Sequence, residues 1–484
     1  MTSTQVEELT FSKGELSSTR RQQILMIVAL GTFMAPLDSS VVNIALPTIR
    51  NHFDASLATV EWVVMAYLLM TSSLLLAYGR LGDIYGHKRI YLTGFSIFTI
   101  GSFLCGIAPT VLWLIIFRGV QAVGAGMLMA MGPAIVTEIT PPQERGKYLG
   151  IIAISVSVAL SVGPILGGLL TAKFGWPSIF YINIPIGVLV VALGKRILPD
   201  SVQKQRQSFD LVGAVTVFIG LMLVLAAVSF SESLGWANLW VIGGLLVGML
   251  VLAAFLLIER RLEHPMLDLT MFKNRLFSMA NLSALFNYMG MFSVVFIMPF
   301  YLQQFRGMTP SQAGLLMIPM PLTTMLVAPL SGSLSDRVDT RYISALGLGI
   351  LAVGLAMLST LHMESTHLSI IIAMMIIGLG SGMFQTPNNS AIMGSVSPNR
   401  RGVASSLLAT MRNLGMVLGV AVSGAVFTHR LAYLTARLQS AGIEAAQVKV
   451  QAFTGAVQLT FWVAASIVVV AIITSLVRGP LKQQ

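Results

Sequence analysis

The chain has 484 residues, of which 55% are hydrophobic and 10% are charged, and its mean hydropathy is +0.81. A soluble domain carries about 25% charged residues, and a disordered chain is also far more polar, so both classes are excluded. A single cysteine, Cys105, excludes a disulfide scaffold. The net charge of +11 fits a nucleic-acid binder or a membrane protein with basic cytoplasmic loops. The hydropathy favours an all-α polytopic membrane protein without a nucleic-acid partner.

Fourteen apolar runs are long enough to cross a bilayer as helices. They are expected at 23–47, 59–79, 90–108, 110–136, 147–171, 177–198, 209–230, 237–258, 277–303, 311–334, 341–361, 367–392, 402–428 and 456–477. The even number places both termini on one side of the membrane. The polar segment 429–455 is expected to be the longest loop on the other side, with a short amphipathic helix on the membrane surface.

The distribution of Lys and Arg predicts the orientation of these spans. Of the 30 basic residues, 22 lie in segments on the side of the termini, six lie on the opposite side, and Arg118 and Arg412 lie within spans. Basic loops face the cytoplasm, so both termini are expected there. The polar tails are residues 1–22 and 478–484, and the N-terminal tail does not look like a cleaved signal peptide.

An internal repeat relates the two halves of the chain. Four sequence pairs carry it, at offsets of 253 or 256: GRLGD (79–83) with GSLSD (332–336), Gly124-Ala-Gly126 with Gly380-Ser-Gly382, Pro142-x-x-Arg145 with Pro398-x-x-Arg401, and Gly163…Gly168 with Gly419…Gly424. We therefore predict a six-helix bundle at 23–200, two inserted helices at 201–265, and a second six-helix bundle at 266–477. Such parallel repeats are typical of transporters whose substrate site lies between the halves.

Asp38 is the only acidic residue well inside a predicted span. An intramembrane carboxylate is costly and by default indicates function, because burial favours its neutral form and allows proton exchange. Arg118 lies at a similar depth in the fourth span, so we expect the two to meet. A neighbouring Arg favours the ionised carboxylate, and this contact can switch proton binding. The alternatives are a permanent structural ion pair and a static Arg bound to carbonyl groups.

Other polar residues within the spans are candidates for a substrate cavity, although most such residues hold helices together. They are Asn43, Tyr67, Gln121, Tyr288, Gln385, Asn388 and Arg412. Two buried Arg against one buried Asp favour neutral or anionic amphiphiles, unless Glu61 reaches inward. No partner is evident for Arg412.

Two glycine-containing motifs have structural interpretations of their own. Gly163, Pro164, Gly167 and Gly168 place small residues at helical spacing, which permits close helix contact. A charged turn after the second span contains Gly79, Asp83, Gly86, Lys88 and Arg89, and Asp336 and Arg337 are its counterparts. Its basic residues fix orientation, and Asp83 is placed to cap a helix N-terminus.

Five motifs in order resemble the major facilitator superfamily, specifically its fourteen-helix drug:proton antiporter branch of EmrB/QacA type. They are LDSSVVNIALP (37–47), GRLGDIYGHKR (79–89), RGVQAVGAG (118–126), VGPILGG (162–168) and WPSIFYINIPIG (176–187). The resemblance implies a major facilitator fold in the inner membrane, a role for Arg118 in proton transfer and a cytoplasmic gate at the charged turn. It also implies export rather than uptake, because the 162–168 motif marks exporters in the family.

We therefore expect a secondary active transporter, not an enzyme. It would export hydrophobic or amphiphilic compounds in exchange for protons and would use no metal or cofactor. The alternative is an exporter of a lipid, fatty acid or siderophore-like metabolite by the same mechanism. Expected partners are these substrates, protons, membrane lipid and, for export across a second membrane, a periplasmic adaptor.

Overall fold

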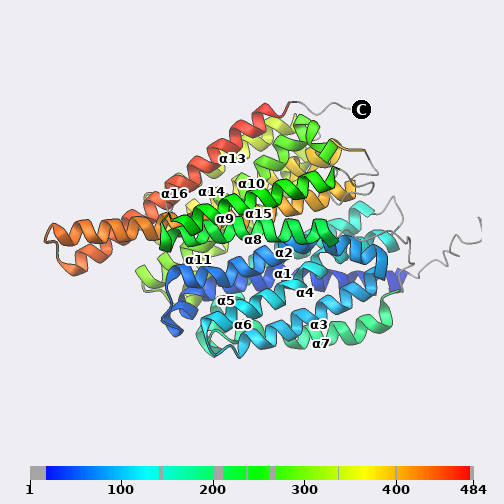
Figure 1. Cartoon of the computed structure of the whole chain (residues 1–484), viewed down its shortest axis with the longest axis horizontal. Coiled ribbons are helices and arrows are strands. Elements are labelled where there is room, and N and C mark those ends of the chain that lie inside the picture. The colour runs from blue at the N-terminus through cyan, green and yellow to red at the C-terminus, as the bar shows by residue number, and fades with distance from the viewer. Residues whose placement is uncertain are drawn as a thin grey trace, which may run out of the picture.

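The structure is a computed structural model that describes residues 18–140, 145–199, 211–235, 238–260, 269–335, 337–397 and 401–479. The described residues are helical, and the long helices run roughly side by side along the long axis (Figure 1). The first half comprises α1 (Ser18–His52), α2 (Leu57–Tyr85), α3 (His87–Gly106), α4 (Val111–Ile139), α5 (Arg145–Phe174), α6 (Ser178–Tyr181) and α7 (Asn183–Ile197). We call this group the N bundle.

The second half begins after a separate helix pair, α8 (Leu211–Leu234) and α9 (Leu239–Glu259). It comprises η1 (Leu269–Lys273), α10 (Arg275–Phe300), the π-helical η2 (Tyr301–Phe305), α11 (Pro310–Met317), α12 (Pro319–Ser335), α13 (Thr340–Leu358), α14 (His367–Gly394), α15 (Arg401–Ser440) and α16 (Ala445–Val477). We call this group the C bundle. Helices α8 and α9 contact each other, and α8 also contacts α2 and α15 at the junction of the bundles.

Each of the fourteen predicted spans coincides with a helix or a pair of short consecutive helices. Twelve helices in the described part of the chain are long and apolar enough to cross a membrane. The predicted spans 147–171 and 209–230 correspond to α5 and α8, which contain the shorter apolar stretches Val158–Phe174 and Val212–Val228. The fold class is thus an all-helical membrane protein, while the number fourteen stays a prediction.

The internal repeat is also present in the structure, in the N-caps of equivalent helices and in the close contacts between helices. Ser56 caps α2 and Thr309 caps α11, at the offset of 253, while Thr110 caps α4 and Thr366 caps α14, at the offset of 256. A hydroxyl at this position accepts from a free backbone N–H of the first turn. A Cβ on Gly124 would lie 2.4 Å from Phe98 N, and one on Gly380 would lie 2.4 Å from Leu351 N. The same backbone contact therefore joins α3 to α4 and α13 to α14.

The segment 429–455 differs from the prediction. Helix α15 continues to Ser440, and α16 begins at Ala445, so the segment forms a helical hairpin rather than a loop with a surface helix. The hairpin turns at Gly442, whose φ is +72°, and it projects beyond the other helices (orange in Figure 1). A stacked pair, Phe305 of η2 and Phe453 of α16, lies at its base with ring centroids 4.6 Å apart. We call this end of the molecule the hairpin end and the opposite one the termini end.

The two bundles are in close contact toward the hairpin end. Arg50 of α1 donates to Gln304 Oε1 (2.7 Å), Gln304 donates to Asn51 Oδ1 (3.2 Å), and Gln303 donates to Ile44 O (2.7 Å). Ser311 Oγ, in α11, also donates to a backbone carbonyl of α5, at 3.1 Å. These hydrogen bonds join residues of η2 and α11 to the N bundle, so the hairpin end is closed between the bundles.

Candidate functional site

The centre of the N bundle holds a buried ion pair between Asp38 of α1 and Arg118 of α4. Both side chains are at most 1% exposed. Gln121, one turn after Arg118, accepts from Arg118 Nη1 (2.6 Å) and donates to Asp38 Oδ1 (2.8 Å). Arg118 Nε donates to Val63 O of α2 at 3.1 Å. A buried ion pair needs such additional hydrogen bonds to offset the loss of water.

Two further residues complete this network, and sequence reasoning did not name them as site residues. Asn183, at the start of α7, donates to Asp38 Oδ1 (2.9 Å) and to Ser102 Oγ of α3 (3.2 Å). Gln121 donates to the same Ser102 hydroxyl at 2.8 Å. Asn183 lies within the 176–187 motif, which was the only signal for it, and nothing in the sequence distinguishes Ser102 from other serines in spans. The side chains of this hydrogen-bonded network therefore come from α1, α3, α4 and α7.

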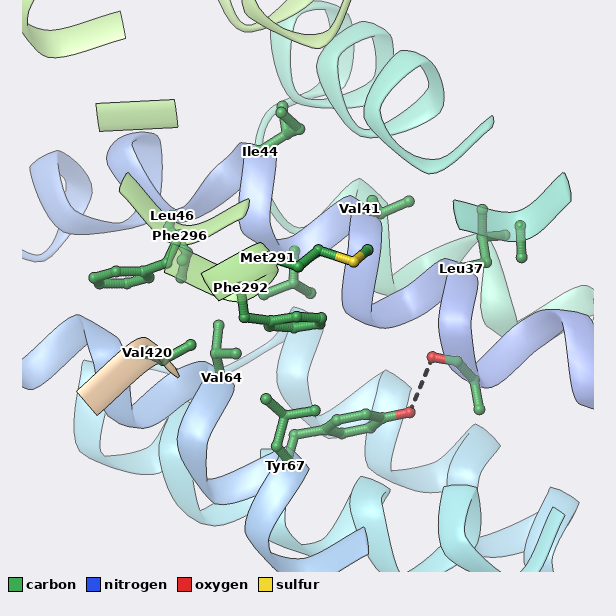
Figure 2. Close-up of a cluster of buried hydrophobic side chains, with 14 of the residues drawn as sticks. Leu37, Val41, Ile44, Leu46, Val64, Tyr67, Met291, Phe292, Phe296 and Val420 are labelled. Carbon is green, nitrogen blue, oxygen red and sulfur yellow. Dashed lines mark hydrogen bonds between the residues drawn. The ribbon is translucent and has the colours of Figure 1, made fainter. Parts of the chain in front are cut away.

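Tyr67 of α2 connects this network to an apolar cluster between the bundles. Its ring lies 4.0 Å from the guanidinium carbon of Arg118, in a cation–π contact, and its hydroxyl donates to Ala35 O (3.2 Å). Figure 2 shows Tyr67 beside apolar side chains of α1, α2, α10 and α15. The members labelled there are Leu37, Val41, Ile44, Leu46, Val64, Tyr67, Met291, Phe292, Phe296 and Val420. Aromatic rings and a flexible Met suit apolar ligands of varied shape.

The remaining predicted cavity residues are dispersed. Asn43 of α1 is buried at 2% exposure, and Gln385 of α14 is half-buried and donates to Ser381 Oγ (2.8 Å). Arg412 of α15, which had no partner in the sequence analysis, is hydrogen bonded to the hydroxyl of Tyr288 in α10. Both side chains of this pair are half-buried.

Asn388 belongs to a cluster at the termini end of the C bundle. Arg478, 2% exposed, donates to Asn388 Oδ1 (2.8 Å), Thr340 Oγ1 (3.1 Å) and Ser344 Oγ (3.3 Å). Burial lowers the pKa of Arg478 to about 10, and the charge of Asp339 opposes this, so the guanidinium stays charged at neutral pH. The cluster joins the end of α16 to α13 and α14, so Asn388 has a structural role here.

The predicted charged turn is mostly helical. Gly79 and Asp83 lie inside α2, and Lys88 and Arg89 lie in the first turn of α3. Only Gly86 forms the turn, with φ +93°, which favours glycine. The Asp83 side chain and the whole of Asp336 lie outside the described residues, and Arg337 is exposed. The sequence alone did not predict the hydrogen bond between His87 Nδ1 and Glu138 Oε2 (2.9 Å). This bond joins the start of α3 to the end of α4.

The glycines of the 162–168 motif provide close helix contacts on two sides of α5. A Cβ on Gly163 would lie 2.5 Å from Ser40 Cβ, and one on Gly167 would lie 2.8 Å from Val41 O, both in α1. A Cβ on Gly168 would lie 2.5 Å from Pro310 O of α11. Pro164 does not interrupt α5, which is continuous through this residue. The motif therefore packs α5 against α1 and, across the bundle interface, against α11.

Glu61 is a second buried acidic residue, and it lies at the bundle interface. Its side chain is fully buried on α2, and a Cβ added to Gly424 of α15 would lie 1.5 Å from Glu61 Oε1. Its carboxyl group therefore lies against the opposite bundle. The preference for neutral or anionic amphiphiles depends on the condition that Glu61 does not reach inward, and this burial of Glu61 at the interface removes that condition.

Comparison with known proteins agrees with this architecture. The family model described as Major Facilitator Superfamily matches residues 28–259, 211–420 and 280–483. The riboflavin transporter RibZ of Clostridioides difficile is 38% identical over 93% of this chain and 96% of its own length. The multidrug resistance protein Stp of Mycobacterium tuberculosis is 33% identical over 87% of this chain and 78% of its own. Multidrug resistance protein 3 of Bacillus subtilis is 31% identical over 85% and 81%.

Solved structures share the fold at low sequence identity. A bacterial homologue of the human lysosomal transporter Spinster, in an inward-facing and unoccupied conformation, has a TM-score of 0.71 at 16% identity, over 96% of this chain and 97% of the other. A D-xylose–proton symporter has a TM-score of 0.67 at 14% identity, over 93% and 96%. The helical repeat, the match to the family model and the similarity to relatives over most of the chain lead to one conclusion. The chain is a transporter that belongs to the Major Facilitator Superfamily.

Proposed function

We propose that this transporter is a proton-coupled antiporter that exports hydrophobic or amphiphilic compounds across the inner membrane by alternating access. The observation that carries the proposal is the buried Asp38–Arg118 pair beside an apolar, aromatic cluster between the bundles. A charge at this depth is expensive, so its retention indicates a functional role. Two of the relatives described above, Stp and multidrug resistance protein 3, are named for multidrug resistance and support the cargo class.

The contacts of the pair suggest how a proton would act on it. Protonation of Asp38 removes its negative charge and weakens the bond to Arg118. Arg118 would still be held by Val63 O and Gln121, and its guanidinium lies over Tyr67. Tyr67 also borders the apolar cluster, so a change in Arg118 reaches the surface where cargo would lie. One proton entering the cell supplies about 2.3 kcal/mol per 100 mV of membrane potential.

The proposed topology has fourteen spans, as in the EmrB/QacA branch. Helix α5 has 30 residues and α8 has 24. At 1.5 Å per residue their lengths are about 45 and 36 Å, which exceed the bilayer core of about 30 Å. With α5 and α8 added to the twelve apolar helices, both termini lie on the side that holds most Lys and Arg. The termini end would then face the cytoplasm and the hairpin end the outside.

A specific cargo candidate is riboflavin. RibZ is similar to this chain over nearly the whole of both proteins. Riboflavin has a flat aromatic ring system, and the apolar cluster between the bundles contains the rings of Tyr67, Phe292 and Phe296. Offset stacking between aromatic rings stabilises such contacts. Transport of riboflavin therefore stands as the second candidate beside multidrug export.

The test is transport into inside-out vesicles with an imposed pH gradient, for riboflavin and for cationic, neutral and anionic amphiphiles. We expect uptake that collapses when the gradient is dissipated and is lost in Asp38→Asn. Glu364→Gln, an exposed carboxylate in the loop before α14, is the matched control and should behave as wild type. Gradient-driven transport of normal rate in Asp38→Asn would refute the assignment of Asp38. Uptake by the wild type that does not depend on the pH gradient would refute proton antiport.

A further inference from the structure

Glu61 and Asp38 differ in the bundle that supplies their contacts. The hydrogen bonds of Asp38 come from Arg118, Gln121 and Asn183, all within the N bundle. Rocking of the bundles as rigid bodies leaves those contacts unchanged. Glu61 instead lies against Gly424 of α15, in the C bundle, so its burial depends on how the two bundles meet.

The position of Glu61 along α2 determines when it becomes exposed. It is four residues after Leu57, the first residue of α2, which places it about 6 Å into the helix from the hairpin end. In alternating access, the bundles separate at this end in one state and come together again at this end in the opposite state. Separation of α2 from α15 brings the Glu61 carboxyl group into contact with water on the hairpin side, and closure buries it again.

Closure must therefore carry a cost that depends on the charge of Glu61. Burial of an ionised carboxyl group costs several kcal/mol, whereas burial of the protonated form costs much less. A carboxyl group that takes up a proton on the open side thus makes closure more favourable. If one proton is bound on closure, the ratio of closed to open molecules changes by up to about tenfold per pH unit.

Other ionisable groups on the helices packed against α2 must be considered as sources of the same pH dependence. One group comprises Asp38, Arg50 and His52 on α1, Cys105 on α3, Arg118 on α4, and His429, Arg430 and Tyr433 on α15. The groups further away are His87, Lys88, Arg89 and Tyr91 of α3, Glu138 of α4, Arg20 and Arg21 of α1, and Arg412 and Arg437 of α15. The described side chains of α8 include no ionisable group. Of these, Asp38 is held in its own network, and His429 is exposed. A substitution at Glu61 separates its contribution from theirs.

We propose that Glu61 is a second proton-binding group of this transporter, which takes a proton from the hairpin side and thereby favours closure of that end. The proposal rests on the antiport function proposed above. After cargo release to the outside, proton uptake by Glu61 would close the exit, and the return to the inward-facing state would follow. Glu61 thus couples protons to the gate, and Asp38 couples them to the cargo site.

The experiment measures gate closure without any cargo. Asn51→Cys and Gln304→Cys place thiols on opposite bundles where the native side chains are hydrogen bonded, while the native Cys105 is fully buried. Cross-linking of this pair by a short bifunctional thiol reagent is followed in the full-length protein from pH 5.5 to 8.5. We expect the cross-linked fraction to fall as pH rises in the wild-type background. In Glu61→Gln it should stay high and nearly independent of pH, because the neutral amide mimics the protonated acid.

Controls distinguish this proposal from the function on which it rests. Glu364→Gln removes an exposed carboxylate at the same end and should keep the wild-type profile. A wild-type pH profile in Glu61→Gln would overturn the proposal, as would cross-linking in the wild type that does not depend on pH. Glu61→Gln that gives no cross-link at any pH would also contradict it. Gradient-driven transport is scored separately, so failure of antiport would appear in that assay and not in the cross-linking.

Discussion

The backbone contact between α5 and α11 offers a direct test of how the hairpin end closes. A Cβ on Gly314 would lie 2.2 Å from Pro164 O, where ordinary contact begins at 3.4 Å. In Gly314→Ala the two helices must therefore separate by about 1.2 Å, or the closed state must accept a clash with a backbone atom. Because the contact joins the two bundles, the strain exists only when this end is closed.

The size of the effect follows from packing energetics. An extra methyl group forced into a well-packed contact costs about 1–3 kcal/mol. Applied to one of two conformations, this energy shifts their ratio by roughly 5- to 150-fold. We expect Gly314→Ala to favour the outward-open state, with gradient-driven transport reduced. Gly349→Ala in α13 is the matched control, since a Cβ there would meet nothing within 4 Å.

Spin labels at positions 51 and 304 would report the separation of the bundles by pulsed electron paramagnetic resonance. Wild type and Gly349→Ala should show mainly the short distance, and Gly314→Ala should show a larger population at the long distance. Gly168→Ala should act in the same direction, because a Cβ there would lie 2.5 Å from a carbonyl of α11. If Gly314→Ala gave the wild-type distance distribution, the α5–α11 contact would not control closure.

Substitutions at three further positions test separate parts of the fold. Arg478→Leu removes the hydrogen bonds to Asn388 and its neighbours, and at about 0.6 kcal/mol per bond it should cost about 2 kcal/mol, seen as a lower thermal midpoint in detergent. Tyr67→Phe keeps the ring over Arg118 and should transport nearly normally, whereas Tyr67→Leu removes the ring and should raise the KM for cargo. Phe453→Ala removes the stacked ring at the base of the hairpin and should make the hairpin more accessible to protease, while a wild-type digestion rate would contradict an anchoring role.

Hydropathy and motif spacing anticipated most of the helices and the meeting of Asp38 with Arg118. Apolar runs identify spans because every backbone polar group in a bilayer must be bonded within a helix. The same criterion missed the hairpin, since α15 continues into water beyond Arg430 through residues that favour helix but are not apolar. Helix α15 ends at Ser440, shortly before Gly442, the first residue after this helix that has a positive φ.

Contacts between distant segments could not be read from the sequence. Asn183 bonds to Asp38 across 145 residues, and Asn388 bonds to Arg478 across 90. An amide in an apolar run looks the same whether it faces a cargo site, a partner helix or a buried cation. Glu61 shows the same limit, because its carboxyl group lies against Gly424 of the other bundle, and only the packed structure brings the two together.

In the proposed mechanism, helix α1 would connect the proton site at Asp38 to the hairpin end. Asp38 lies in its middle, and the next residues, Ser40 and Val41, contact the glycines of α5. Ile44 O and Arg50 then bond to the glutamines of η2 at the hairpin end. A change at Asp38 is therefore two helical turns from a residue that holds the opposite bundle. These glutamines lie in a π-helical segment, and such segments are often found at functional sites. In the proposed mechanism, Asp38 would therefore act on the hairpin end through one continuous helix, and Glu61 would act on the same end from α2.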